Sequence, residues 1–406
     1  MTKSIIFRVL LKRGLILPLT AVLAFWYFGV NTNVMNTRKC LATGNHITHS
    51  HSSEKKQIRW DSFEDRRNHL RKTCDSMPKF KQSGTLVSLK GQYLLYDSKH
   101  DFVFCMVQKI GCTFWRRVFH LLTHNISDLY SIDNYKVHQE TLPSLERLHI
   151  NKTGRILQSA TTALFVREPY ERAVSGYLDK LFAINSYYME TLGRQIVRMT
   201  RKNASVEALT CGHDVTFTEF IQYILEMKRK NKIESIDHHF TPIYIHCSPC
   251  AVKYDFIGRM ENFQEDTTAI FKQTGIFRNR TISMEIKDFM GDEIRITFKE
   301  VLVTRKALSH CMTLPEMYGR AWKTLQLRGI INPDVPMPSS QNVTLEMLHR
   351  EAVEANDPSR VSEYKHGAFV NLYKTLDRKL LEEFREYLLP DCKLFGYNDR
   401  PPELFS

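Results

Sequence analysis

The first stretch with residues suited to binding a ligand is 102–119, where an apolar segment leads through a short polar loop into a helical pattern. The loop holds Lys109, Gly111 and Thr113. Amide groups at the start of a helix have no partner inside the helix, and with the helix dipole they form an anion site. Gly111 lets the backbone approach closely, Lys109 adds positive charge and Thr113 adds a hydroxyl donor. The loop is not of the G-x-x-x-x-G-K-[ST] type, because its lysine precedes the glycine. We therefore predict a phosphate-binding loop of a different kind.

The second stretch, residues 163–180, repeats this order of strand, loop and helix. Arg167 falls at the carboxyl end of the predicted strand, where open α/β sheets bind ligands. Pro169 suits the first turn of the next helix, and Ser175 follows about two turns later. A guanidinium fork and a hydroxyl could hold one phosphate between them. The alternatives are a solvated arginine and a serine that bonds to its own helix.

The elements that would position these loops alternate between strand and helix. We predict strands at 102–107 and 163–166 and helices at 114–122, 170–182 and 217–229. This alternation indicates an α/β fold with a central, mostly parallel sheet flanked by helices. We also expect a short helix at about 60–71, an irregular insertion with some helices at about 275–365, and a helix at 372–388 that ends at Pro390.

Together the two stretches resemble the phosphosulfate loops of the Golgi carbohydrate sulfotransferases that include the chondroitin and dermatan 4-O-sulfotransferases. The family pattern P-K-V-G-C-T-x-W-K-R matches residues 108–117, and R-[DE]-P-[FY]-x-R-x-x-S-A-[FY]-x-x-K matches residues 167–180. Residues 239–258 and 391–397 resemble two further family motifs. The sequence departs from the pattern at Gln108, Gly176 and Phe240, and residues 275–365 look longer than the family's equivalent.

The resemblance implies a P-loop-like sulfotransferase fold and PAPS (3′-phosphoadenosine 5′-phosphosulfate) as the sulfuryl donor. It assigns Lys109 to the leaving phosphate, and Arg167 with Ser175 to the 3′-phosphate. The remaining donor-binding residues of the first loop are then Ile110, Gly111, Cys112, Thr113 and Phe114.

A histidine suits the role of general base for a sugar hydroxyl. His138 lies between the two loops and is slightly preferred as the general base. His239 in the third motif is the other candidate. Either could instead be a structural histidine. The reaction needs no metal. The implied acceptor is an anionic glycan, either a glycosaminoglycan of the chondroitin or dermatan kind or a glycoprotein glycan. The alternative is a luminal glycan-binding protein that has this fold without catalysis.

Residues 14–30 are uncharged and mostly apolar, and the basic residues before them outnumber those that follow closely. The positive-inside rule then predicts a signal anchor of a single-pass type II Golgi membrane protein. The expected parts are a cytosolic tail at 1–13, the anchor at 14–30, a luminal stem at 31–85 and a luminal sulfotransferase domain at 86–406. A cleaved signal peptide and a buried core helix are the alternatives.

The formal net charge of the 406 residues is +13, which favours anionic partners. Nucleic acid is not expected, because zinc-finger spacing, RNP-type aromatic motifs and long basic runs are missing.

The sequence contains nine cysteines, and in an oxidising lumen some of them should form disulfides. Because the number is odd, at least one cysteine must be free or bonded to another molecule. For Cys247 and Cys250 we expect disulfides with other cysteines rather than zinc ligation. Five Asn-x-Ser/Thr triplets predict a glycoprotein: Asn125, Asn151, Asn203, Asn279 and Asn342. Homo-oligomerisation is left open.

Overall fold

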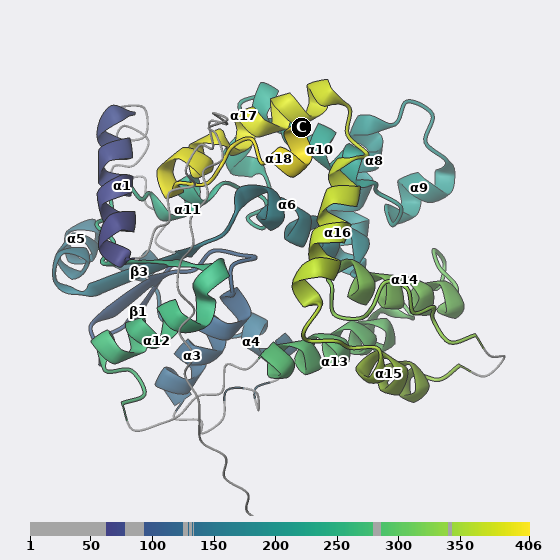
Figure 1. The fold of residues 1–406 in the computed structure, drawn as a ribbon, viewed down its shortest axis with the longest axis horizontal. Coiled ribbons are helices and arrows are strands. Elements are labelled where there is room, and N and C mark those ends of the chain that lie inside the picture. The colour runs from purple at the N-terminus through teal and green to yellow at the C-terminus, as the bar shows by residue number, and fades with distance from the viewer. Residues whose placement is uncertain are drawn as a thin grey trace, which may run out of the picture. The chain divides into compact units, whose positions relative to one another are not determined.

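A computed structural model describes residues 62–77, 93–124, 129, 132, 134–278, 286–339 and 343–406. It contains a four-stranded sheet in the order β1-β2-β3-β4, which lies in the left half of Figure 1. Strand β1 (Leu94–Asp97) pairs antiparallel with β2 (Phe102–Cys105), and β2, β3 (Thr161–Val166) and β4 (Phe256–Arg259) are parallel. The predicted mixed α/β fold with a mostly parallel sheet is thus confirmed.

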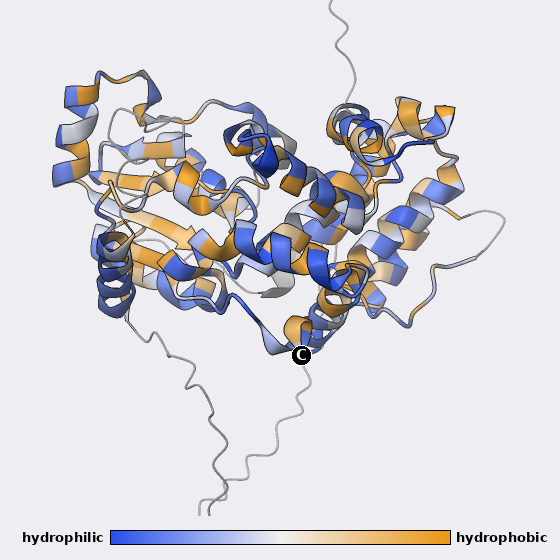
Figure 2. Ribbon diagram, turned by 90° about the horizontal axis from the view of Figure 1, so that it is seen from above, coloured by the Kyte–Doolittle hydropathy of each residue, from blue (hydrophilic) through white to orange (hydrophobic). Residues whose placement is uncertain are grey.

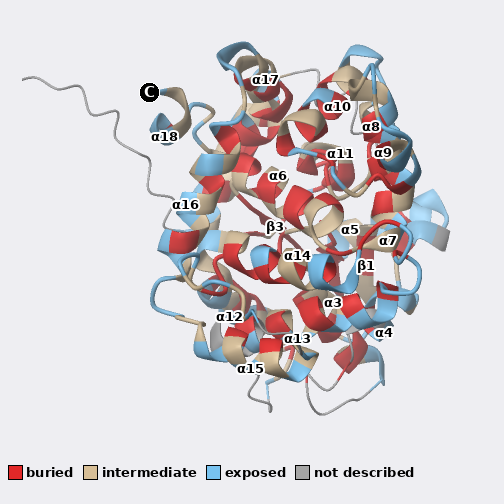
Figure 3. Ribbon diagram, turned by 90° about the vertical axis from the view of Figure 1, so that its right-hand side faces the viewer, coloured by how far each residue is buried: buried red, intermediate tan, exposed pale blue. Residues whose placement is uncertain are grey.

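Burial explains why β2 and β3 read as continuous apolar runs. Every residue of β2 is buried, as are the last five of β3, because the sheet is covered on its faces (Figures 2 and 3). Trp115 is fully buried and stacks on Phe104, with 4.2 Å between ring centroids. Phe165 packs against the same indole, so strands and following helix share one aromatic core.

The helices that follow these strands begin close to where the sequence predicts. Helix α3 (Cys112–His124) follows β2, and α6 (Pro169–Tyr177) follows β3 and continues as a π-helical turn, η4 (Leu178–Phe182). Helix α10 (Phe217–Arg229) matches its predicted bounds. Other helices between α3 and β4 are α4 (Asn134–Gln139), α5 (Ile150–Ser159), α7 (Ser186–Tyr188), α8 (Arg194–Thr200), α9 (Val206–Cys211) and α11 (Ile243–Cys247).

The C-terminal part forms a second core with α6, α8 and α10. It consists of α16 (Val361–Tyr373), α17 (Arg378–Phe395) and α18 (Pro402–Phe405). The predicted end at Pro390 is wrong, because α17 runs through the proline to Phe395. Proline removes one helical hydrogen bond, to the carbonyl of Glu386. Glu386 is exposed, so water can replace that bond, while buried Leu388 and Leu394 hold the helix in the core.

The predicted insertion is more regular than expected. Helices α13 (Ile286–Thr304), α14 (Leu314–Leu327) and α15 (Leu345–Glu354) lie together (Figure 1). They form most of a third apolar core, to which Ile184, Met189 and Cys211 also contribute. A disulfide between Cys211 and Cys311 joins it to α9. The insertion is therefore a packed helical layer next to η4 and α16.

Helix α1 (Phe63–Ser76) lies within the range predicted as a stem, yet it packs against β4 and α17. Helix α12 (Phe263–Thr274) covers the same strand, and buried Arg66 donates to Asp266 at 2.6 Å. The Cys74–Cys250 disulfide adds a covalent tie.

Cys247 is bonded to Cys105, so both cysteines of the third motif form disulfides, as predicted. Cys112 and Cys392 are free thiols, and Cys40 lies outside the described residues. The predicted anchor at 14–30 also lies outside them. Within the described ranges no helix is both long and apolar enough to span a bilayer.

Candidate active site

The loop after β2 has an unusual backbone. Lys109 and Gly111 both have left-handed conformations, with φ of 69° and 78°. A Cβ on Gly111 would lie 2.7 Å from the Phe263 ring, so only glycine fits there. Such alternating conformations turn successive amide groups toward one side and form an anion-binding concavity. Among the described residues, no hydrogen bond uses the amides of Cys112 or Thr113 at the start of α3. The loop can therefore bind an anion with its main chain.

Two predicted donor-binding residues of this loop offer only their backbone. The side chains of Ile110 and Phe114 are 1% and 3% exposed and belong to the sheet core. Cys112 is a half-buried free thiol, and the Thr113 hydroxyl lies 3.2 Å from His138 Nε2. Lys109 and Thr113 are thus the side chains of this loop that present polar groups to the site.

Arg167 connects the second loop to the first. Its Nη1 donates to the carbonyl oxygen of Lys109 at 3.2 Å, and its Nη2 donates to Glu171 Oε2 at 3.0 Å. Lys365 from α16 lies 3.2 Å from the same carboxylate oxygen. Because β2 and β3 are parallel neighbours, both loops leave the sheet at one edge, and this hydrogen bond holds them in contact.

Buried Arg172 joins the first loop to the third motif, and the sequence reasoning assigned it no role. Its Nε donates to the carbonyl of Gln108 at 3.1 Å and its Nη1 to the carbonyl of Thr241 at 2.8 Å. Arg172 is the second arginine of the matched stretch at 167–180, which is the signal that could have found it. One α6 arginine therefore fixes the relative positions of two candidate loops.

Asp179 is a second residue that the sequence reasoning missed. It lies on the π-helical turn η4, a kind of turn often found at functional sites. Its Oδ2 is 3.0 Å from both Lys109 Nζ and Lys180 Nζ, and its Oδ1 is 2.9 Å from Arg328 Nη2. Arg328 directly follows α14, so the predicted insertion contributes a cation to the site.

The Asp179 carboxylate and its three neighbouring cations shift one another's pKa values. Burial would raise the pKa of Asp179, but the three cations hold it well below its usual value. Burial lowers the pKa of Lys109, and Arg328 and Lys180 add to this while Asp179 opposes it. Because 27% of the Asp179 side chain is accessible, water screens part of these interactions. The cluster carries net positive charge, which suits an anionic ligand.

His239 is held by a carboxylate. Its Nδ1 lies 2.7 Å from Asp237 Oδ1 and 3.1 Å from the Tyr188 hydroxyl. Asp237 is an acceptor, so Nδ1 carries the proton and Nε2 keeps its lone pair. Burial lowers the pKa of His239 to about 4, although the hydrogen bond that its ring donates to Asp237 acts in the opposite direction. The imidazole is therefore neutral near pH 7 and can accept a proton.

His138 has a different setting. Its side chain remains exposed on one side, and its Nε2 faces the Thr113 hydroxyl. Desolvation by the surrounding groups lowers its pKa to about 3, and the cations of Arg116 and Lys180 act in the same direction. The charge of His239 also affects this pKa, so the structure brings the two predicted histidines into one site.

Ser175 is half-buried on α6, and no hydrogen bond within the described part of the chain involves its hydroxyl. Next to it, a Cβ on Gly176 would lie 2.8 Å from the Phe240 ring. Phe240 is 5% exposed and packs on Phe220. Two of the departures from the family pattern, Gly176 and Phe240, are therefore neighbours in the structure. At the third, Gln108, the amide oxygen Oε1 is buried without a partner among the described residues, so it could accept a hydrogen bond from a ligand.

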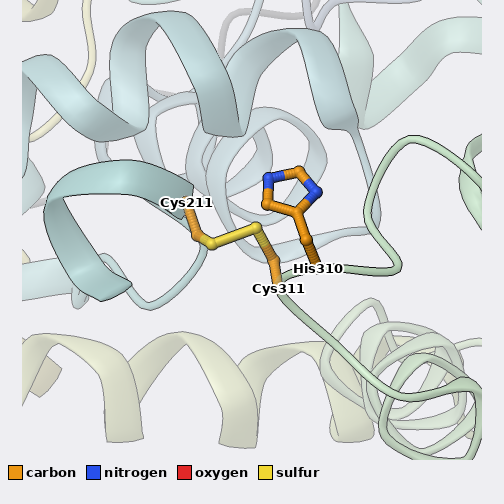
Figure 4. A group of neighbouring side chains, drawn as sticks. All are labelled: Cys211, His310 and Cys311. Carbon is orange, nitrogen blue, oxygen red and sulfur yellow. A yellow bond between two sulfur atoms is a disulfide. The ribbon is translucent and has the colours of Figure 1, made fainter. Parts of the chain in front are cut away.

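Three groups of described side chains have spacing suited to a metal ion. Cys211 and Cys311 of the first group are bonded to each other beside His310, so their sulfurs are not available as ligands (Figure 4). The second group, at 237–239, belongs to the site just described. The third group is His120, His124 and Glu140.

The mixed α/β fold places two candidate anion-binding loops next to each other at the carboxyl ends of parallel strands. The chain belongs to the sulfotransferase family, whose model matches residues 92–313. It is similar to carbohydrate sulfotransferase 8 of mouse, with 32% identity over 59% of this chain and 58% of that protein. Human carbohydrate sulfotransferase 8 is 36% identical over 50% of this chain and 47% of that protein, and rat carbohydrate sulfotransferase 11 is 33% identical over 52% and 61%. The chain thus matches about half of the length of these relatives. No solved structure matches it.

Proposed function

We propose that this protein is a PAPS-dependent carbohydrate sulfotransferase that transfers a sulfuryl group to a sugar hydroxyl of an anionic glycan. The family membership and the names of the relatives support sulfuryl transfer to carbohydrate. An acceptor of the glycosaminoglycan or glycoprotein class is consistent with the net charge of +13.

One observation carries the proposal: the hydrogen bond from Arg167 to the carbonyl of Lys109. It keeps the loop after β2 and the loop after β3 next to each other, as a ligand with two separated phosphates requires. The free amides of the first loop would hold the 5′-phosphosulfate, and Lys109 would neutralise charge on the leaving phosphate. Arg167 and Ser175 would hold the 3′-phosphate. The Gln108 Oε1, which has no partner among the described residues, could accept a hydrogen bond from such a ligand.

In the proposed reaction, the sugar oxygen attacks sulfur and the bond between sulfur and the bridging oxygen of the donor breaks. The hydroxyl proton passes to the base, and 3′-phosphoadenosine 5′-phosphate leaves. Positioning and electrostatics account for most of the acceleration in related in-line transfers. We assign the base to His239 rather than to His138. Asp237 fixes the Nδ1 proton of His239 and leaves Nε2 free, whereas Nε2 of His138 already contacts Thr113.

The anchor at 14–30, type II topology and Golgi location remain part of this proposal on the sequence pattern alone. The second hypothesis, a glycan-binding protein without catalysis, rested on Gln108 and Phe240. Phe240 is 5% exposed and packs on Phe220, so this departure changes a buried packing residue and does not favour loss of activity.

The test is transfer of labelled sulfate from PAPS by the full-length chain to chondroitin, dermatan and desulfated glycans. We expect transfer to at least one acceptor, with a loss of at least about 100-fold in Lys109→Ala and Arg167→Ala. Lys99→Ala, in the exposed turn before β2, is the matched control and should retain full activity. Glycan binding without transfer to any acceptor would favour the second hypothesis, and full activity of both variants would refute the site.

A further inference from the structure

Helix α3 carries a second cluster of ligand-type side chains on the turns away from the phosphate loop. His120 and His124 are one helical turn apart on the same face, and Glu140 approaches them from the end of α4. Glu140 Oε2 lies 3.0 Å from His120 Nδ1 and 3.4 Å from His124 Nε2. We propose that these three side chains bind a divalent cation of the zinc class, which fixes α4 to α3.

The distances agree with a metal site. Nitrogen and carboxylate ligands of tetrahedral zinc lie about 2.0–2.2 Å from the ion, which places them roughly 3.3–3.6 Å from one another. The three ligand atoms already lie within 4.8 Å of one another. Two imidazoles and one carboxylate form a set that zinc accepts, with a fourth position for water. His124 is 50% exposed, so an ion can enter from solvent without opening the core.

The contacts around the cluster also favour a cation. His120 is 1% exposed, and its Nε2 lies 3.3 Å from the carbonyl of Val137. The ring of His120 thus lies between two acceptors, and when its Nε2 donates to the carbonyl, either a second ring proton or a cation must lie between Nδ1 and the carboxylate. A cation at that position matches the usual arrangement of metal-binding histidines, whose other ring nitrogen is bonded to a backbone carbonyl or carboxylate.

Two neighbouring cations do not occupy this position. Lys136 Nζ lies 3.6 Å from Oε1, the other oxygen of Glu140. Arg116 donates to the main-chain carbonyls of Val137 and Glu140. Both therefore leave Oε2 facing the histidines.

The site has a structural consequence for the candidate active site. His138 lies on α4, and Thr113 lies in the first turn of α3. An ion that joins Glu140, just after α4, to the C-terminal half of α3 would hold the two helices together and keep His138 next to Thr113. The ion would position this histidine and take no part in sulfuryl transfer. The inference does not depend on the proposed function, because metal binding can be measured without activity.

The first experiment titrates the untagged full-length chain with Co²⁺ and Zn²⁺. Tetrahedral Co²⁺ gives visible absorption bands, and Zn²⁺ should displace it. We expect His124→Ala and Glu140→Gln each to bind one ion fewer than wild type, or to bind it at least tenfold more weakly. Both changes lie at accessible positions, so the variants should fold. His349→Ala, a half-exposed histidine on α15, is the matched control and should bind like wild type.

The second experiment measures hydrogen exchange of residues 134–140 with and without Zn²⁺. Slower exchange in wild type and unchanged exchange in His124→Ala would support the clamp. If His124→Ala binds the ions as wild type does, or if wild type binds none, the cluster is only a hydrogen-bonded group and the proposal is wrong. Zinc binding without any change in exchange would refute the clamp between α4 and α3.

Discussion

The two strand-end loops and the helical layer of α13 to α15 contribute to the candidate site in different ways. The loops present Lys109 and Arg167 from segments whose residue order already indicates an anion site. The helical layer contributes Arg328, whose neighbours in the sequence carry no such pattern. Both regions meet at Asp179, which contacts Lys109 from one and Arg328 from the other. The difference teaches that a motif can identify the anion-binding loops without revealing which charges position them.

The largest effect should come from removing the group at which the two regions meet. The Asp179→Asn substitution removes the counterion that three cations share, so these cations should move apart. They are Lys109, Lys180 and Arg328. We expect kcat/KM for transfer from PAPS to fall about 100-fold, and Arg328→Gln to cost about tenfold. Arg360→Gln, which removes an exposed pair on α16, is the control. An unchanged kcat/KM in both Asp179→Asn and Arg328→Gln would separate the helical layer from the site.

A second prediction concerns how the helical layer is attached. The Cys211–Cys311 disulfide closes a loop with a sequence separation of 100 residues. Replacing both cysteines by alanine should lower the free energy of unfolding by about 2–4 kcal/mol. Chemical denaturation of the oxidised wild type and the double variant measures this. A loss below about 0.5 kcal/mol would mean that packing alone holds the layer.

A third prediction tests how closely Gly176 of α6 packs against the Phe240 ring. Gly176→Ala places a methyl group 2.8 Å from the buried Phe240 ring, so the ring must shift. We expect a loss of about 1–3 kcal/mol in unfolding free energy. Gly319→Ala in α14 meets nothing within 4 Å and should instead stabilise by about 0.5–1 kcal/mol. Equal effects of the two substitutions would contradict the account of Gly176 and Phe240.

The smallest predicted effect is in the pH profile. Because the pKa of His239 in the free protein is about 4, the base should stay deprotonated down to about that pH. The kcat/KM for transfer should therefore fall only below about pH 4–5. Asp237 raises this pKa, so Asp237→Asn should move the acid limb to lower pH and reduce the rate. An acid limb near pH 6.5 in wild type would exclude His239 in this environment.

The lowered pKa of His239 also makes the free energy of unfolding depend on pH. A histidine whose pKa is lowered on folding binds fewer protons in the native than in the unfolded state between about pH 4 and 6.5. Stability from His239 should therefore be lost as the pH falls through this window. His239→Gln should make the unfolding free energy less dependent on pH there.

The sequence predicted strands β2 and β3 and the loops after them because their signals are local, but it did not predict β1 or β4. Helix α10 begins with a capping box of Thr216 and Glu219, and its apolar residues have helical spacing, so its bounds were found. The end at Pro390 was wrong because tertiary burial outweighs the local cost of the proline. Asp179 and Arg328 could not be paired from the sequence, because 149 residues separate them. Asp237 lies two positions before a candidate base, but only the fold shows that its carboxylate reaches the His239 ring.

The most direct test of the central claim compares binding of 3′-phosphoadenosine 5′-phosphate and 5′-AMP by calorimetry with the full-length chain. If the two loops hold opposite ends of one nucleotide, the 3′-phosphate should tighten binding at least about 100-fold, as expected for a lost charge-assisted pair. Arg167→Ala should abolish most of that preference. Equal affinities for the two nucleotides in wild type would contradict the account.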